Sequence, residues 1–183
     1  MLLRGRVALI AVFVANYILN LVAFEASALE PITGAFGYQL GEVFDTSDSS
    51  RLDESLWENS PYVEDYRVTP PAPVEGFNHY DVRVTKDRKE ITAIKAWRVT
   101  DSEPECDAIL SEYVQALELK YGQSEEDDLL GRVATIKQGR REISLVCNFS
   151  HQLRLMYRDV TVFDAARERM IKKKVDSLAT DGL

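Results

Sequence analysis

The strongest constraint on the fold is a pair of strand-like segments joined by a short charged turn. In "HYDVRVT", the apolar residues Tyr80, Val82 and Val84 alternate with polar ones. This period of two is typical of a strand with one buried face. Residues 86–89 form a charged turn, and "EITAIKAWRVT" follows with a second strand-like composition. We therefore predict an antiparallel hairpin over residues 80–100.

A helix is predicted directly after this hairpin. Ser102 is a suitable N-cap, and Glu105 stands three residues later, which is the spacing of a capping box. Gly122 occupies the position of a C-terminal cap. Between these caps, apolar residues recur at the spacing of one helical face. These residues are Cys106, Ile109, Leu110, Tyr113, Val114, Leu117 and Tyr121.

The remaining elements complete a predicted α+β order. After the helix we expect strands at 132–137, 142–149 and 152–158, and a second helix at 161–178. Before the hairpin we expect a short strand at 36–40, a short helix around 52–57 and an extended segment at 62–68. This order predicts an antiparallel sheet of about five to six strands, with both helices packed on one face.

The chain contains two cysteines, Cys106 and Cys147. Cys106 lies on the apolar stripe of the predicted helix, and Cys147 shares a strand face with Ile143 and Leu145. An even pair in an oxidising compartment usually forms a disulfide, although buried thiols and metal-bound thiolates are alternatives. The spacing is not C-x-x-C, so it does not indicate a thioredoxin-type redox site. We predict a Cys106–Cys147 disulfide that fixes the helix to the sheet.

Residues 1–28 have the pattern of an export signal. Two arginines precede a long apolar run, and small residues follow around Ala28. We expect cleavage near Ala28, which leaves residues 29–183 as one α+β domain that is periplasmic or secreted. The alternative is an uncleaved membrane anchor with the domain facing outward.

The charge of the chain argues against several kinds of partner. The net charge is −8 at pH 7, which repels nucleic acid and anionic lipid. One basic segment, "RERMIKKK", departs from this balance. Its cations suit the C-terminal end of the last helix, or they form a docking surface for an acidic partner.

The glycine-rich stretch "GAFGYQLG" resembles a phosphate-binding loop only superficially. Gly34, Gly37 and Gly41 fit neither the dinucleotide-binding spacing nor the P-loop spacing, and Glu42 places an anion where phosphate would lie. We therefore expect these glycines to provide a corner, with positive φ angles or a bulge.

The sequence predicts no catalytic residue, cofactor-binding residue or metal ligand. A calcium-loop pattern that begins at Asp45 lacks the required residues at Ser50 and Leu56. The two histidines and two cysteines include no close pair that would begin a zinc site. A G-x-S-x-G nucleophile motif is also missing, whereas catalysis by two distant carboxylates stays open. Because these motifs are missing, the sequence favours a function other than catalysis.

The first half of the chain is rich in aromatic residues. Most of them are expected in the core or as cross-strand partners, and an exposed subset would form a binding groove. The candidate binding surface consists of these aromatics and the cations of the last helix. Its members are Trp57, Tyr62, Tyr66, Phe77, Lys172, Lys173 and Lys174.

Four segments resemble those of small exported bacterial proteins that have no assigned activity. They are "GAFGYQLG", "VTPPAPVEGFNHYDVRVT", "CDAILSEYVQALELKYG" and the terminal "DGL". The resemblance implies an exported α+β domain and no catalytic residue. We expect a non-catalytic domain that binds a protein or other molecule of the cell envelope or exterior. The alternatives are a small carboxylate-dependent enzyme and a membrane-tethered envelope accessory factor.

Overall fold

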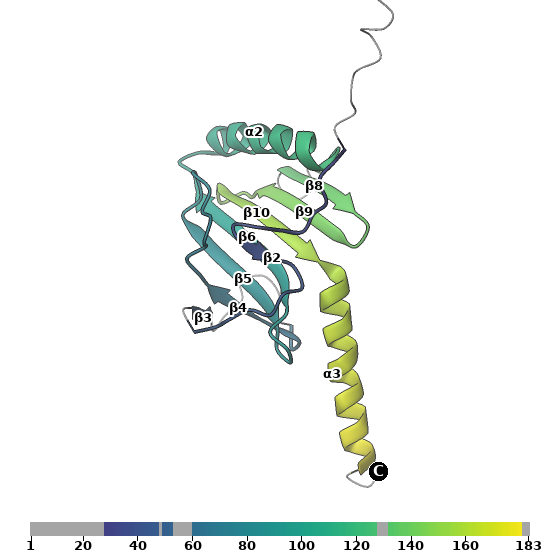
Figure 1. Cartoon of the computed structure of the whole chain (residues 1–183). Helices are drawn as coiled ribbons and strands as arrows, with labels where there is room; N and C mark the ends of the chain where they lie inside the picture. Colours follow the sequence, from purple (N-terminus) through teal and green to yellow (C-terminus); the bar gives the residue numbers. More distant parts are fainter. Residues whose placement is uncertain (1–27, 48, 53–59, 128–131, 181–183) are drawn as a thin grey trace, which may run out of the picture.

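A computed structural model describes residues 28–47, 49–52, 60–127 and 132–180 (Figure 1). The fold is α+β, as the sequence predicts. The segment predicted as an export signal lies outside the described residues except for Ala28, and so does most of the predicted helix at 52–57.

The main sheet is antiparallel and has eight strands, in the order β3-β4-β5-β6-β10-β9-β8-β7. These strands are β3 (Ser50–Leu52), β4 (Val63–Arg67), β5 (His79–Thr85), β6 (Ile91–Val99), β7 (Glu125–Asp127), β8 (Arg132–Gln138), β9 (Arg141–Cys147) and β10 (Gln152–Asp159). The predicted hairpin is β5–β6, and the three strands expected after the helix are β8, β9 and β10. Pairing of β6 with β10 joins the two halves of the sheet.

The prediction of five to six strands is therefore wrong. The two strands at the edges of the sheet, β3 and β7, are each three residues long and mostly exposed. Because the sequence of β7 is Glu-Glu-Asp, it has no alternation of apolar and polar residues that would indicate a strand. Short, charged edge strands of this kind protect a sheet from pairing with other chains.

Helix α2 (Glu103–Tyr121) lies across one face of the sheet, over β8, β9 and β10 (Figure 1). The side chain of Ser102 accepts a hydrogen bond from the Glu105 N–H at 3.4 Å, which confirms the N-cap. Gly122 is the C-cap, with φ of 107°. Cys106 and Leu110 are fully buried, and the disulfide Cys106–Cys147 confirms the predicted link between helix and sheet.

The N-terminal segment covers the β4–β6 part of the same face. Its buried side chains include Ile32, Phe36, Leu40 and Phe44, and Phe36 packs edge-on against Tyr80 with ring centroids 5.2 Å apart. Of the strand predicted at 36–40, only Tyr38–Gln39 is formed. The strands β1 (Gly34–Ala35) and β2 (Tyr38–Gln39) make a separate two-stranded ribbon.

The glycines of this ribbon have the structural role that the sequence predicts. The turn between β1 and β2 places Phe36 at φ of 56° and Gly37 at φ of 89°. A Cβ atom on Gly37 would lie 2.8 Å from Cβ of Pro71. The stretch is thus a tight corner over which the chain between β4 and β5 can pack closely.

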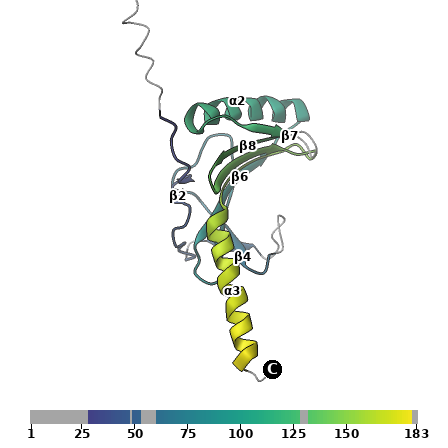
Figure 2. The ribbon, with the colours of Figure 1, turned by 90° about the vertical axis from the view of Figure 1, so that its right-hand side faces the viewer.

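Helix α3 (Val160–Thr180) does not pack beside α2, so the prediction of two helices on one face is wrong. It begins where β10 ends, and Asp159 caps it by accepting a hydrogen bond from the Thr161 N–H at 2.9 Å. Ala166 is fully buried, whereas residues 171–179 are exposed. The helix projects beyond the end of the sheet (Figures 1 and 2), because only its first turns carry side chains that contact the body.

Candidate functional site

The structure separates the residues of the predicted binding surface. Tyr66 and Phe77 are each only 8% exposed. The Tyr66 ring packs against Phe44 with centroids 5.6 Å apart. The ring of Phe77 packs against Tyr113 with centroids 5.2 Å apart. These two aromatics therefore belong to the core and not to an exposed groove.

The other members of the set lie elsewhere. Tyr62 is half-buried in the turn just before β4, and Trp57 lies outside the described residues. Lys172, Lys173 and Lys174 are exposed on α3, beyond the end of the sheet (Figure 1). The lysines and the two core aromatics thus form no common surface.

The exposed part of α3, residues 171–179, is called the distal segment below. It presents three large apolar side chains to solvent: Ile171 is 43% exposed, Val175 57% and Leu178 46%. Their i, i+4, i+7 spacing places them on one side of the helix. The adjacent lysines make this segment both apolar and basic, which is the composition of a recognition helix.

The apolar stripe of the distal segment is not a continuation of the side that packs on the sheet. At roughly 100° per residue, Ile171, Val175 and Leu178 lie roughly 120–180° around the helix from Ala166. Ala166 is the fully buried residue of α3. The stripe therefore faces away from the contact between α3 and the body.

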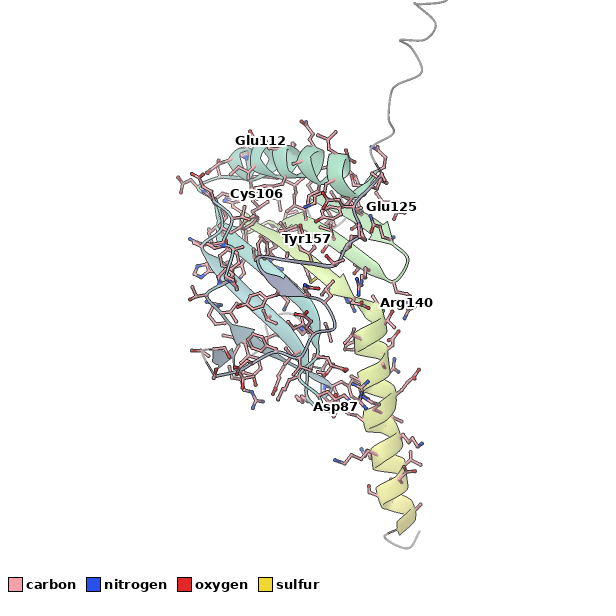
Figure 3. The ribbon with its side chains drawn as sticks, in the orientation of Figure 1. Asp87, Cys106, Glu112, Glu125, Arg140 and Tyr157 are labelled. Atoms are coloured by element: carbon pink, nitrogen blue, oxygen red, sulfur yellow. A yellow bond between two sulfur atoms is a disulfide. The ribbon has the colours of Figure 1, made fainter. Side chains whose placement is uncertain are left out.

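The body contacts α3 through a separate set of ionic interactions. Arg169 donates hydrogen bonds to Asp87 at 2.7 Å and to Glu90 at 2.7 Å, both at the β5–β6 hairpin. Figure 3 shows Asp87 beside α3. These bonds raise the pKa of Arg169 above its ordinary value and keep the guanidinium charged. They orient the helix and leave the distal segment beyond the hairpin.

A second notable surface is the face of the sheet opposite α2, which carries buried charges. Arg83 donates two hydrogen bonds to Asp65, from Nε at 2.9 Å and from Nη2 at 3.0 Å. Lys95 Nζ donates to the same carboxylate at 3.1 Å. The side chains of Arg83, Asp65 and Lys95 are 9%, 2% and 5% exposed. Ion pairs this deeply buried have high desolvation costs, so their geometry must be closely maintained.

The ionic network continues along β5 and β6. Asp81 accepts hydrogen bonds from Arg67 and from the indole N–H of Trp97, the latter at 3.1 Å. His79 stacks on Trp97 with ring centroids 3.9 Å apart. Alternation along β5 places these residues on the face opposite Tyr80, Val82 and Val84. The sequence does not reveal this network, because alternating polar residues usually indicate a solvated face.

Two cavities lie next to Lys95 on this polar face. The larger, of about 90 Å³, is bounded by Arg83, Lys95 and Arg158, and by the apolar side chains of Met156 and Phe163. The smaller, of about 40 Å³, includes Lys95, Trp97 and Arg154. Burial lowers the pKa of Lys95 to about 8, and the nearby charge of Arg83 acts in the same direction, while Asp65 opposes both. Burial also lowers the pKa of Arg154 to about 10.

Among the residues that the structure describes, no group of three or more His, Cys, Asp or Glu side chains could hold a metal ion. No helix in the described ranges is both long and apolar enough to span a membrane. No protein-family model, curated protein or solved structure matches the chain.

Proposed function

We propose that this chain is an exported binding domain that docks on an acidic protein of the cell envelope or exterior through the distal segment of α3. The observation that carries the proposal is the exposed stripe of Ile171, Val175 and Leu178 beside Lys172, Lys173 and Lys174. Its anchors follow the i, i+4, i+7 pattern by which an amphipathic helix enters an apolar groove.

The charge of the segment specifies the chemistry of the partner. Residues 171–179 contain three lysines and one acid, Asp176, on a chain whose net charge is −8. Cations at the rim of an apolar stripe favour a partner with carboxylates around its groove, because complementary charges speed association and suppress wrong partners. The export signal predicted for residues 1–28 and the disulfide support an extracytosolic setting for this encounter.

Two other occupants of the stripe are less compatible with the molecule. Antiparallel pairing of two distal segments would bring their lysine clusters together and create repulsion. An anionic membrane would be repelled by the acidic body. The chain also enters the fold at the α2 end, whereas α3 projects from the opposite end (Figures 1 and 2). A tether at the N-terminus would therefore direct the distal segment away from its own membrane.

The test is site-specific photocrosslinking in cells that express the full chain. A benzophenone amino acid replaces Val175 on the stripe. The same group at Leu119 of α2, which is 85% exposed, is the control position. We expect Val175 to crosslink to a different protein at an acidic segment, and Leu119 to give no such product.

Charge variants supply the second half of the test. Lys172→Gln, Lys173→Gln and Lys174→Gln together should abolish the crosslink. A control triple, Arg51→Gln, Lys120→Gln and Lys137→Gln, removes the same charge at exposed sites elsewhere and should preserve it. Crosslinking to a second copy, to lipid only, or to nothing would refute the proposal. Equal loss in both triple variants would also refute it, since it would indicate a general charge effect.

A further inference from the structure

We propose that a cavity between the N-terminal segment, the residues that follow β4 and the start of β6 binds a small organic ammonium ion through the carboxylates of Glu42 and Asp45. This site is separate from the distal segment of α3. It goes beyond the docking function proposed above, and neither proposal depends on the other.

The size of this cavity suits a small molecule. Its volume is about 350 Å³, within the range of roughly 300–1,000 Å³ that is typical of small-molecule sites. The two cavities beside Lys95 measure only about 40 and 90 Å³. The wall is built mainly from Tyr38 and residues 42–45 of the N-terminal segment, from residues 68–69 after β4, and from Ile91 of β6.

Backbone hydrogen bonds hold this wall in place. The Gly41 N–H donates to the carbonyl of Ile91, and the Ile91 N–H donates to the carbonyl of Glu42, both at 2.8 Å. The Phe44 N–H donates to the carbonyl of Lys89, also at 2.8 Å. The segment that carries the two carboxylates is therefore paired with the β5–β6 hairpin. Such support gives a site more precise geometry than a free loop would.

The cavity has two negative charges that no cation among the described residues neutralises. Glu42 and Asp45 border it, whereas no lysine, arginine or histidine of the described residues does. The Glu42 carboxylate is exposed and makes no hydrogen bond or ion pair with any described residue. Arg51 and Lys89, on the elements beside the cavity, both form ion pairs with Glu64. A cationic ligand would thus meet no competing cation from this wall.

The other groups of the wall favour an organic cation over a metal ion. The Ser47 N–H donates to Asp45 at 3.0 Å and lowers the pKa of this carboxyl, which keeps it charged. Two carboxylates are few for a calcium ion, which takes six to eight oxygen ligands. The rings of Tyr38 and Phe44 also border the cavity, with centroids 6.0 Å apart. Aromatic rings attract ammonium groups through their π faces.

Isoleucine methyl groups offer a direct probe. Ile91 is in the cavity wall, and Ile171 on the distal segment of α3 is an internal control. The full chain, labelled with ¹³C at its isoleucine methyl groups, is titrated separately with n-butylammonium chloride and tetramethylammonium chloride. Sodium chloride holds the ionic strength constant, and n-butanol is the neutral counterpart. We expect the Ile91 signal to move saturably with an ammonium salt while the Ile171 signal stays fixed.

The double change Glu42→Gln and Asp45→Asn should weaken binding about fivefold or more, because two charge-assisted contacts are lost. Both residues are exposed, and asparagine keeps the oxygen that accepts the Ser47 N–H. Glu103→Gln with Glu112→Gln is the matched control, since it removes two charges at exposed positions of α2. Its affinity for the ammonium ion should equal that of the original protein.

The two salts identify the kind of ammonium group. Saturation by n-butylammonium alone assigns a group with N–H donors, saturation by tetramethylammonium alone assigns a methylated group, and saturation by both assigns a general ammonium site. Linear shifts up to about 100 mM of both salts would overturn the proposal. Equal saturation by n-butanol would also overturn it, and so would an unchanged affinity in the Glu42 and Asp45 double variant. None of these results bears on crosslinking through α3, so the two proposals fail independently.

Discussion

Lys95 places an ammonium group in an almost fully buried position, with 5% of its side chain exposed. Burial lowers the pKa of this group to about 8 in the folded protein, against about 10.4 in an unfolded chain. The charged groups around it are Asp65 from β4, Asp81 and Arg83 from β5, and Arg154 and Arg158 from β10. The consequence is a dependence of stability on pH.

The sign of this dependence follows from proton binding. Between pH 8 and 9.5 the unfolded chain keeps a proton on Lys95 that the folded chain has largely released. Stability from this group therefore rises with pH, by at most about 1.4 kcal/mol per unit. We expect the difference in free energy of unfolding between the original protein and Lys95→Met to grow in favour of the original over this window. Urea titrations at three pH values measure it, and parallel curves would contradict the assignment.

Gly37 illustrates a different constraint, which concerns the backbone. Gly37→Ala places a Cβ atom at φ of 89° and 2.8 Å from the Pro71 side chain. We expect a loss of about 2 kcal/mol in the free energy of unfolding from conformational strain and steric overlap. Gly139→Ala is the matched control, because φ is 64° there and nothing lies within 4 Å. Denaturant unfolding should show a loss of about 1 kcal/mol for this control, and equal losses would exclude the contact with Pro71.

At the scale of elements, the sequence predicts those parts whose periodicity is strong. The apolar spacing from Cys106 to Tyr121 and the caps at Ser102 and Gly122 identify α2, and the predicted disulfide follows from its stripe. Edge strand β7 was not predicted, because an exposed Glu-Glu-Asp segment carries no periodic signal. The buried Asp65–Arg83–Lys95 cluster could not be predicted either, since it depends on the register between three strands.

The last helix was predicted, but its position was not. The sequence shows that Phe163, Ala166 and Met170 recur at helical spacing. It does not show how far along the helix the contact with the sheet extends. In the structure, contact with the body ends soon after Arg169. The remaining large apolar residues, Ile171, Val175 and Leu178, are exposed because they lie beyond that contact and on the opposite side of the helix from Ala166.

The position of α3 predicts a sharp contrast in stability along one helix. The double change Ile171→Asp and Val175→Asp should alter the free energy of unfolding by less than about 0.5 kcal/mol, because both residues are exposed. Ala166→Asp should cost about 3 kcal/mol or more, since it buries a carboxylate. Urea unfolding followed by tryptophan fluorescence measures both. A loss above about 1 kcal/mol for the double variant would indicate that the stripe packs within the chain.

At the scale of the whole molecule, the lysines of the distal segment lie far from the α2 end (Figure 1). Glu112 and Glu125 lie at the α2 end, whereas the lysines of the distal segment lie at the other (Figure 3). The chain also enters the fold at the α2 end, where the Glu30 N–H donates a hydrogen bond to the carbonyl of Lys120 at 2.8 Å. The distal segment of α3 is therefore an exposed basic segment on a chain whose net charge is −8, and this contrast is the reason to expect an acidic partner there.

The disulfide fixes α2 to the second half of the sheet. Cys106 and Cys147 are separated by 41 residues in sequence. Closing a loop of this length stabilises a fold by about 4 kcal/mol in the chain-entropy model. The free energy of unfolding of the oxidised protein should exceed that of the reduced protein by roughly this amount, as measured by denaturant titrations with and without dithiothreitol. The double variant Cys106→Ala and Cys147→Ala cannot form the bond. Its free energy of unfolding should therefore be the same with and without dithiothreitol. A difference below about 1 kcal/mol would mean that the packing of Leu110 and Val114 already holds the helix, and that the bond constrains the unfolded chain little.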